Sequence, residues 1–150
     1  MPLRKRDRRG GKWRPPGSGP DFVNGVILAE TTLSASELLA VSHDVEAALG
    51  RTRRQRWEAR IIDLDLIDYD GQVLPDHETW ITWANLPAKD QQTVAPDGLI
   101  LPHPRVQDRA FVLVPLATAV PDWTHPVTGQ PVSAMIKALD AGDVAVVTPL

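Results

Sequence analysis

Residues 59–71, ARIIDLDLIDYDG, place two acids inside a run of branched apolar side chains. This alternation is the pattern of a β-strand with one apolar face. Alternate residues of a strand point to the same face, so Asp63 and Asp65 would share a face with their Cα atoms about 6.5–7 Å apart. Their apolar neighbours would point into the core, and the Asp-Gly pair at 70–71 would close the strand in a turn. The sequence therefore predicts a strand that carries two like charges side by side.

Two carboxylates this close repel each other unless a cation lies between them. Oxygen ligands without a neighbouring His or Cys suit magnesium, which takes one or two carboxylates and completes its shell with water and phosphate oxygens. The competing interpretation is a solvent-facing edge strand on which Asp63 and Asp65 only pair with arginines. An Asp-x-Asp pattern alone does not separate these two interpretations.

Arginines surround the acid pair in the sequence and favour the metal interpretation. Guanidinium groups are forked donors that match phosphate oxygens. Acids that bind magnesium, together with arginines that neutralise phosphate charge, form a site for a polyphosphate. The chain has no glycine-rich Walker loop, so it is not a P-loop enzyme. Each arginine taken alone could be a surface charge; the set is Arg51, Arg53, Arg54, Arg56, Arg60, Arg105 and Arg109.

Strand and helix patterns are mixed along the 150 residues, which predicts one domain of the α/β (α+β) class. Ser34 and Glu37 have the spacing of a capping box, and Leu38, Val41, Val45 and Leu49 form a helical stripe. The expected elements of the first half are a loop over 14–21, an interior strand over 22–31, a helix over 34–50 with Gly50 at its end and a charged loop over 51–57. The second half is expected to contain a long loop with a hairpin over 75–98, a short strand over 99–104, a helical stretch over 109–121 capped by Asp108, a helix over 131–140 and an edge strand over 144–150. Pro115 is expected either to interrupt the stretch over 109–121 or to begin its better-formed second part.

Four sequence blocks resemble, in order and spacing, the 6-hydroxymethyl-7,8-dihydropterin pyrophosphokinases of folate biosynthesis. The blocks are PDFVN at 20–24, Glu46 followed by LGR at 49–51, RWEARIIDLDLI at 56–67 and LPHPRVQDRAFVLVPLATAVPDW at 101–123. The resemblance covers about residues 20–137. It implies a ferredoxin-like sheet with packed helices, two Mg2+ ions, and ATP as the co-substrate whose pyrophosphate is transferred to the pterin with release of AMP.

The resemblance also implies roles for individual residues. Asp63 and Asp65 match the two magnesium ligands and, with the loop arginines Arg51 and Arg60, form the catalytic set. Pterin-binding positions are matched by Phe22, Asn24, Trp57 and Phe111, and ATP-binding positions by Glu46, Arg51, Arg60, His103 and Arg109. Aromatic faces and a few placed hydrogen-bond partners are what a flat heteroaromatic needs.

Several of these residues have a simpler interpretation. Phe22 and Phe111 could belong to the core, and His103 between two prolines could be a turn residue. Asn24 is harder to explain in an apolar strand, because a buried amide without partners costs about 1–3 kcal/mol.

The charge is unevenly distributed, because seven of the 16 Lys and Arg lie in the first 14 residues. Residues 1–19 are therefore expected to be a basic, disordered stub, and residues 20–150 the pterin pyrophosphokinase domain. A nucleic-acid interface or a targeting peptide are the alternatives for the stub. Trp13 is its only aromatic residue, which argues against a platform for nucleic acid.

The absence of cysteine, of a signal-peptide pattern and of a long apolar run predicts a cytoplasmic protein without disulfides or membrane contact. The expected partners are ATP and the pterin; the sequence does not indicate a protein partner.

The match departs from the family at the start, where an apolar strand and a helix are expected and the basic stub stands instead. Three explanations are open: a wrongly assigned start codon, a decayed gene, or a true short form. The alternative to an active diphosphotransferase is therefore a truncated remnant that binds nucleotide or pterin without turnover.

Overall fold

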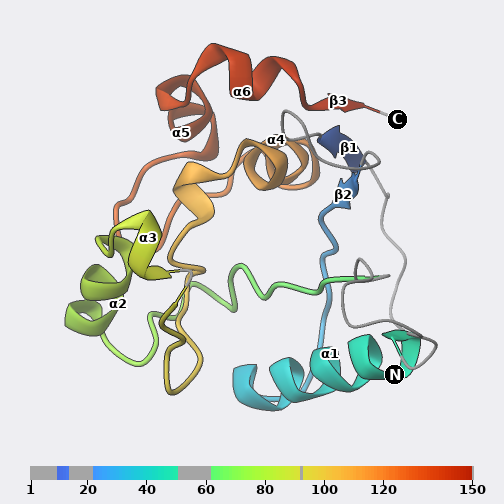
Figure 1. The fold of residues 1–150 in the computed structure, drawn as a ribbon, viewed down its shortest axis with the longest axis vertical. Helices are drawn as coiled ribbons and strands as arrows, with labels where there is room; N and C mark the ends of the chain where they lie inside the picture. Colours follow the sequence, from blue (N-terminus) through green and yellow to red (C-terminus); the bar gives the residue numbers. More distant parts are fainter. Residues whose placement is uncertain (1–9, 14–21, 51–61, 92, 150) are drawn as a thin grey trace. The chain divides into compact units, whose positions relative to one another are not determined.

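The computed structural model describes residues 10–13, 22–50, 62–91 and 93–149. They fall into two compact units, which we call the sheet unit (residues 1–31 and 104–150) and the aspartate unit (residues 32–103). Figure 1 labels the helices and strands of both. A mixture of helices and short strands confirms the expected mixed class.

The sheet unit contains a three-stranded antiparallel sheet in the order β2-β1-β3. β1 (Gly10–Trp13) lies at its centre, within the stretch for which the sequence predicts a stub. It pairs with β2 (Phe22–Gly25) on one side and with β3 (Thr148–Pro149) on the other. The edge strand predicted over 144–150 is confirmed at Thr148–Pro149 only; Val144 and Ala145 lie in a helix instead.

The prediction of an interior strand over 22–31 is wrong in two respects. The strand ends at Gly25, and among the described residues β2 is an edge strand, because its ladder there runs along one side only. The side chains of Val23 and Ile27 are 65% and 71% exposed. Apolar residues on both faces of a predicted strand do not show whether the strand is central or at an edge. That depends on the strands that pair with it, which come from elsewhere in the chain.

Helix α4 (Ala110–Ala119) packs against β1, β2 and the C-terminal helices α5 (Val132–Ala138) and α6 (Ala141–Ala145). Both α4 and α5 confirm predicted helices. The expectation that Pro115 interrupts the stretch or begins its second part is wrong, because α4 runs without a break from Ala110 through Pro115 to Ala119. Their contacts form the core of the sheet unit, whose buried apolar residues include Val106, Leu113, Leu116, Val132 and Met135.

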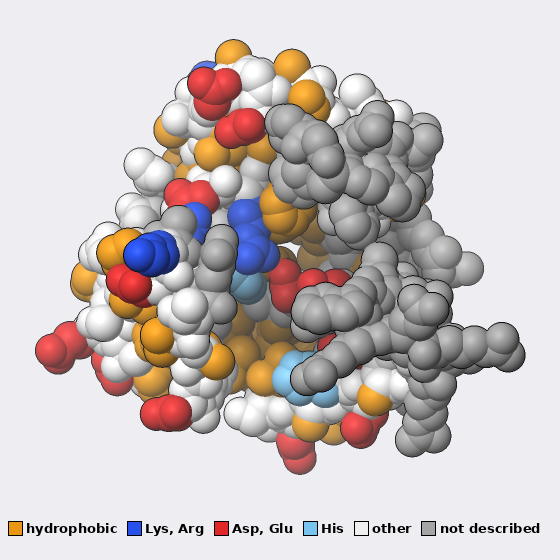
Figure 2. Space-filling model, in the orientation of Figure 1, with side chains coloured by type: hydrophobic (Ala, Val, Ile, Leu, Met, Phe, Trp, Pro, Cys, Tyr) orange, Lys and Arg blue, Asp and Glu red, His pale blue; other side chains and the backbone are white. Residues whose placement is uncertain are grey.

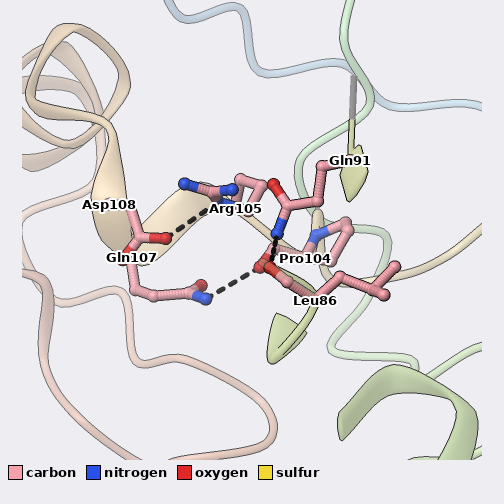
Figure 3. A network of polar contacts seen from close by, with 6 residues as sticks. All are labelled: Leu86, Gln91, Pro104, Arg105, Gln107 and Asp108. Carbon is pink, nitrogen blue, oxygen red and sulfur yellow. Dashed lines mark hydrogen bonds and ion pairs between the residues drawn. The ribbon is translucent and has the colours of Figure 1, made fainter. Parts of the chain in front are cut away.

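The predicted cap of α4 by Asp108 is wrong. Asp108 ends a short 3-10 helix, η1 (Val106–Asp108), and the N-cap of α4 is Arg109, without a side-chain cap. The Asp108 carboxylate instead accepts a hydrogen bond from Arg105 Nε at 2.8 Å, as Figure 3 shows. The Asp108 carboxylate that was expected to cap α4 is therefore used in the ion pair with Arg105, three residues before it.

In the aspartate unit, α1 (Ala35–Gly50) confirms the predicted helix and its capping box. Ser34 N donates to Glu37 Oε2 at 2.7 Å, and Glu37 N donates to Ser34 Oγ at 3.2 Å. Hydrogen bonds to the Glu37 carboxylate from the backbone N–H and then from the side chain of Ser34 lower the pKa of Glu37. The apolar stripe further along α1 is partly exposed, at 45%, 40% and 46% for Val41, Val45 and Leu49. Apolar side chains are accordingly visible among polar ones over α1 in Figure 2.

The long loop with a hairpin predicted over 75–98 is wrong, because this stretch contains α2 (His77–Ala84) and α3 (Ala88–Gln91). Asp76 is the N-cap of α2, and its carboxylate accepts from Thr79 N at 2.8 Å. Trp80 is 4% exposed and donates from Nε1 to Pro102 O at 2.7 Å. An Asp before a Trp-containing run was the available sequence signal for this helix.

The short strand predicted over 99–104 is also wrong. Leu101 forms only an isolated antiparallel bridge with Leu74, through hydrogen bonds of 2.9 and 3.0 Å. Pro75 and Pro102 follow the two bridge residues directly, and proline has no N–H with which to continue a ladder. The bridge therefore stays one residue pair long.

Two of the predicted loops, over 14–21 and 51–57, lie outside the described residues. Among the helices of the described part, none has the length and apolar character required to cross a membrane.

The capping box predicts a measurable loss of stability. Ser34→Ala removes one half of it and should lower the free energy of unfolding by about 1 kcal/mol in urea denaturation. Ser36→Ala, in the same turn and exposed, is the control and should change stability far less.

The same box predicts a pH dependence. Because the folded state lowers the pKa of Glu37, its contribution is complete above the ordinary pKa and is lost as the pH falls through the lowered pKa. Glu37→Gln should flatten this part of the stability profile. An unchanged acid limb in Glu37→Gln would contradict the assignment.

Candidate functional site

Residues 62–68 carry the two aspartates but form no regular strand, so the predicted strand over 59–71 is wrong where the structure describes it. The alternation of its side chains is nevertheless as predicted. Asp63 and Asp65 are exposed, whereas the apolar residues between and beside them are part-buried. A strand assignment requires a ladder with a neighbouring segment, and over 62–68 the described residues supply none. Extended backbone with period-two burial is what remains.

Three hydrogen bonds hold this segment in the aspartate unit. Leu64 N donates to Glu46 Oε1 on α1 at 2.6 Å. His103 N donates to Ile67 O at 2.8 Å, and Tyr69 Oη donates to Leu33 O at 2.5 Å. These contacts attach the segment to α1, to the stretch before α1 and to the end of the unit.

The segment ends in the predicted turn. Asp70 and Gly71 have φ of 50° and 66°, and Gln72 N donates to Tyr69 O at 3.0 Å. Asp68 Oδ1 also accepts from Gly71 N at 3.2 Å. Consecutive left-handed residues favour an Asp-Gly pair, which explains why the sequence located this turn correctly.

The chemistry open to Asp63 and Asp65 follows from their exposure. Within the described ranges, no group of three or more His, Cys, Asp or Glu is arranged to hold a metal ion. A complete protein cage, as calcium or structural zinc would need, is therefore not formed by this part of the chain. Two exposed carboxylates from one segment do fit magnesium, whose remaining positions are taken by water and phosphate oxygens.

Two further site residues predicted from the sequence also lie in the aspartate unit. Glu46, predicted to bind ATP, accepts the hydrogen bond from the aspartate segment. His103, also predicted to bind ATP, contributes a backbone contact to the same segment, and its side chain is part-buried. Sequence reasoning did not assign Tyr69 or the contact between Glu46 and Leu64. The hydrogen bond between Glu46 and Leu64 joins residues 18 apart, so no short sequence pattern indicates it.

Asn24 in the sheet unit has an unusual environment. It lies in β2 opposite Gly11, and its amide nitrogen Nδ2 is buried without a hydrogen-bond partner in the described structure. A buried donor of this kind costs about 1–3 kcal/mol, so it calls for an explanation. A ligand with a hydrogen-bond acceptor would supply the missing partner.

Phe111 and Arg109 lie at the start of α4, which packs against β2. The guanidinium carbon of Arg109 is 5.8 Å from the centroid of the Phe111 ring, and both side chains are part-buried. A cation at this distance over an aromatic face is attracted to it. The structure therefore brings an aromatic ring and a cation to the helix that covers the strand of Asn24.

The remaining predicted residues are not described. Arg51, Trp57 and Arg60 lie outside the described residues, and of Phe22 only the backbone, in β2, is described. Their roles stay predictions.

Comparison with known proteins shows the family to which the chain is similar. A family model described as 7,8-dihydro-6-hydroxymethylpterin-pyrophosphokinase (HPPK) matches residues 11–121, which include every candidate site residue. A 2-amino-4-hydroxy-6-hydroxymethyldihydropteridine pyrophosphokinase of Synechocystis sp. is 35% identical over 130 residues, or 87% of this chain and 56% of the relative.

Proteins of the same name from Methylorubrum extorquens and Pseudomonas aeruginosa are each 36% identical. The first is matched over 84% of this chain and 68% of its own length, the second over 74% and 56%. The chain thus spans between 56% and 68% of the length of these relatives.

The environment of Asn24 predicts that this residue lowers stability. Asn24→Leu keeps the size of the side chain and removes the unsatisfied donor, so the free energy of unfolding should rise by about 1 kcal/mol. Asn85→Leu, at an exposed amide, is the control and should stay within about 0.5 kcal/mol of the wild type. Urea denaturation measures both, and a large loss of stability in Asn24→Leu would show that the amide has a partner.

Proposed function

We propose that this chain, which belongs to the 7,8-dihydro-6-hydroxymethylpterin-pyrophosphokinase family, transfers the pyrophosphoryl group of ATP to 6-hydroxymethyl-7,8-dihydropterin and releases AMP. The observation that carries the proposal is the pair of exposed carboxylates, Asp63 and Asp65, on a segment tied to α1. Such a pair suits a magnesium nucleotide. The family and the names of the relatives support the choice of the two substrates.

Asp63 and Asp65 would hold the magnesium, and the proposal includes two ions. When bound, the magnesium would neutralise charge on the phosphates of ATP. The aspartates themselves contribute negative charge and position, and their exposure leaves room for phosphate and water oxygens.

Cationic and polar side chains would bind the nucleotide. Arg51 and Arg60 are proposed to stabilise the negative charge that develops between donor and acceptor. His103, Arg109 and Glu46 are proposed on the ATP side, where Glu46 also supports the aspartate segment. Catalysis in this scheme is positioning together with charge stabilisation.

The pterin would be held by Asn24 and by aromatic rings. The buried Nδ2 of Asn24 would donate to an acceptor on the edge of the pterin. Phe111 would stack against one face of the pterin, with Arg109 beside the Phe111 ring; Phe22 and Trp57 are the other aromatic candidates. Stacking with one or two fixed polar contacts is the usual way to orient a flat ligand.

The finer assignment of the fold is also part of the proposal. We place the start of the family domain before the expected residue 20, so that residues 20–150 are joined by β1, because β1 is the central strand of the small antiparallel sheet that packs against α4. We assign this sheet to the ferredoxin-like class. We expect the reaction to take place in the cytoplasm, where ATP is supplied.

A second candidate is a protein that binds nucleotide or pterin without turnover. The apolar stripe on α1 favours this candidate, because it is partly exposed. A helix that packs only partly against its neighbours holds the site residues attached to it less rigidly than a fully packed helix.

The two candidates are separated by an assay of AMP release with ATP, the pterin and Mg2+. The proposed enzyme releases AMP, and Asp65→Asn and Asp63→Asn should each lower kcat by about 100-fold or more. Asp97→Asn, an exposed acid of the same unit, is the control and should leave the rate unchanged.

Isothermal titration calorimetry with ATP and Mg2+ completes this test. Binding without AMP release would support the second candidate. Full activity in Asp65→Asn would overturn the metal assignment. Absence of turnover, together with no binding of ATP and none of the pterin in a parallel titration, would overturn both candidates.

A further inference from the structure

We propose that Glu46 is a positioning residue: its carboxylate fixes the backbone between Asp63 and Asp65 and so sets the geometry of the metal-binding pair. The inference rests on the proposed function. It assigns to Glu46 a role through the aspartate segment, in addition to any contact with the nucleotide.

The position of the bond is the first argument. Leu64 stands between the two aspartates, and its N–H donates to Glu46 Oε1 at 2.6 Å. Hydrogen bonds to an ionised acceptor are shorter and stronger than neutral ones. A fixed peptide plane at Leu64 restrains the directions in which both neighbouring side chains leave the backbone.

The lack of a ladder is the second argument. In a sheet, the N–H of Leu64 would donate to a neighbouring strand, but the described part of the chain forms no ladder along 62–68. A backbone donor away from water needs an acceptor, and the Glu46 carboxylate takes the place of a strand carbonyl. The other described backbone contact of this segment, from His103 N to Ile67 O, lies two residues beyond Asp65.

The anchoring of Glu46 is the third argument. It lies on α1, a 16-residue helix whose start is closed by the capping box of Ser34 and Glu37. The side chain of Glu46 is part-buried, unlike that of the neighbouring Asp44, which is exposed. A part-buried acid near the C-terminal end of a helix is disfavoured by the helix dipole, so a donor such as Leu64 N–H is needed to offset that cost.

The consequence for the reaction is geometric. Without an acceptor at Glu46, the Leu64 N–H would turn to water and the segment would relax, displacing both carboxylates together. Misplacement of catalytic groups by about 1 Å costs on the order of 100-fold in rate. Binding of the pterin, for which Phe22, Asn24 and Phe111 of the sheet unit are candidates together with Trp57, should change little.

Three substitutions separate the acceptor from the charge. Glu46→Gln keeps a carbonyl acceptor at the same reach and removes the charge. Glu46→Asp keeps the charge and withdraws the acceptor by one methylene, and Glu46→Ala removes both. Asp44→Ala, on the same helix and exposed, is the matched control.

The primary measurement is hydrogen exchange of the Leu64 amide by NMR, which does not depend on activity. Exchange should become about tenfold faster or more in Glu46→Asp and Glu46→Ala, and stay within about threefold of the wild type in Glu46→Gln and Asp44→Ala. Titration with Mn2+, followed by paramagnetic broadening at residues 62–66, should show weaker binding in the same two variants.

Kinetics supply the second measurement. In Glu46→Asp and Glu46→Ala, kcat should fall and the Mg2+ concentration for half-maximal rate should rise, with the pterin KM nearly constant. Glu46→Gln should lose clearly less of kcat than Glu46→Asp or Glu46→Ala, because it keeps an acceptor for the Leu64 N–H, and Asp44→Ala should leave kcat unchanged.

Two results would overturn the inference. If Glu46→Gln were as impaired as Glu46→Ala, Glu46 would act through its charge; unchanged Leu64 exchange in Glu46→Ala would mean that the bond does not restrain the segment. If the wild type released no AMP, the proposed function would fail, while Leu64 exchange and the Mn2+ titration would still decide the inference. If Glu46→Ala did not fold, the pair Glu46→Asp and Glu46→Gln would make the same comparison.

Discussion

A backbone segment without a neighbouring strand must find other partners for its polar groups, and this constraint governs the aspartate unit. Residues 62–68 satisfy part of it through the Glu46 carboxylate, which accepts from Leu64 N, and through His103 N, which donates to Ile67 O. Directly after the segment, Tyr69 Oη donates to Leu33 O. Each partner comes from a different part of the unit. The aspartates are thus presented by an extended segment that long-range contacts hold in place, and the exposure of their carboxylates follows from its period-two geometry.

The candidate chemistry is divided between the two units. The aspartate unit carries the acids suited to a magnesium nucleotide, and the sheet unit carries a buried amide and an aromatic ring suited to a flat heterocycle. Asn24 shows the cost that the proposed site would carry, because a buried Nδ2 without a partner lowers stability and a bound acceptor would offset that loss. A site that is less stable when empty is a common consequence of selection for binding.

Local patterns predicted local structure well. Ser34 and Glu37 lie within one helical turn, so their spacing alone located the start of α1, and the Asp-Gly pair located its turn for the same reason. The strand over 59–71 failed because its existence depends on a partner that the pattern cannot identify. The kinds of residue in the candidate site could be predicted from their chemistry. The hydrogen bond between Leu64 N and Glu46 could not, because it joins positions 18 apart in the sequence and depends on how the chain folds. Helix α2 was missed because its Trp residues resemble a loop or hairpin by composition, although Asp76 marked its start.

The bridge between Leu74 and Leu101 has a consequence for the behaviour of the protein at high concentration. Short extended segments with open backbone groups are the usual starting points for intermolecular β-pairing. Here Pro75 and Pro102 directly follow the bridged residues; Pro102 is buried with Leu101, whereas Pro75 is exposed. An incoming chain would find no N–H at Pro75, so this one proline would oppose edge-to-edge pairing at the exposed side of the bridge.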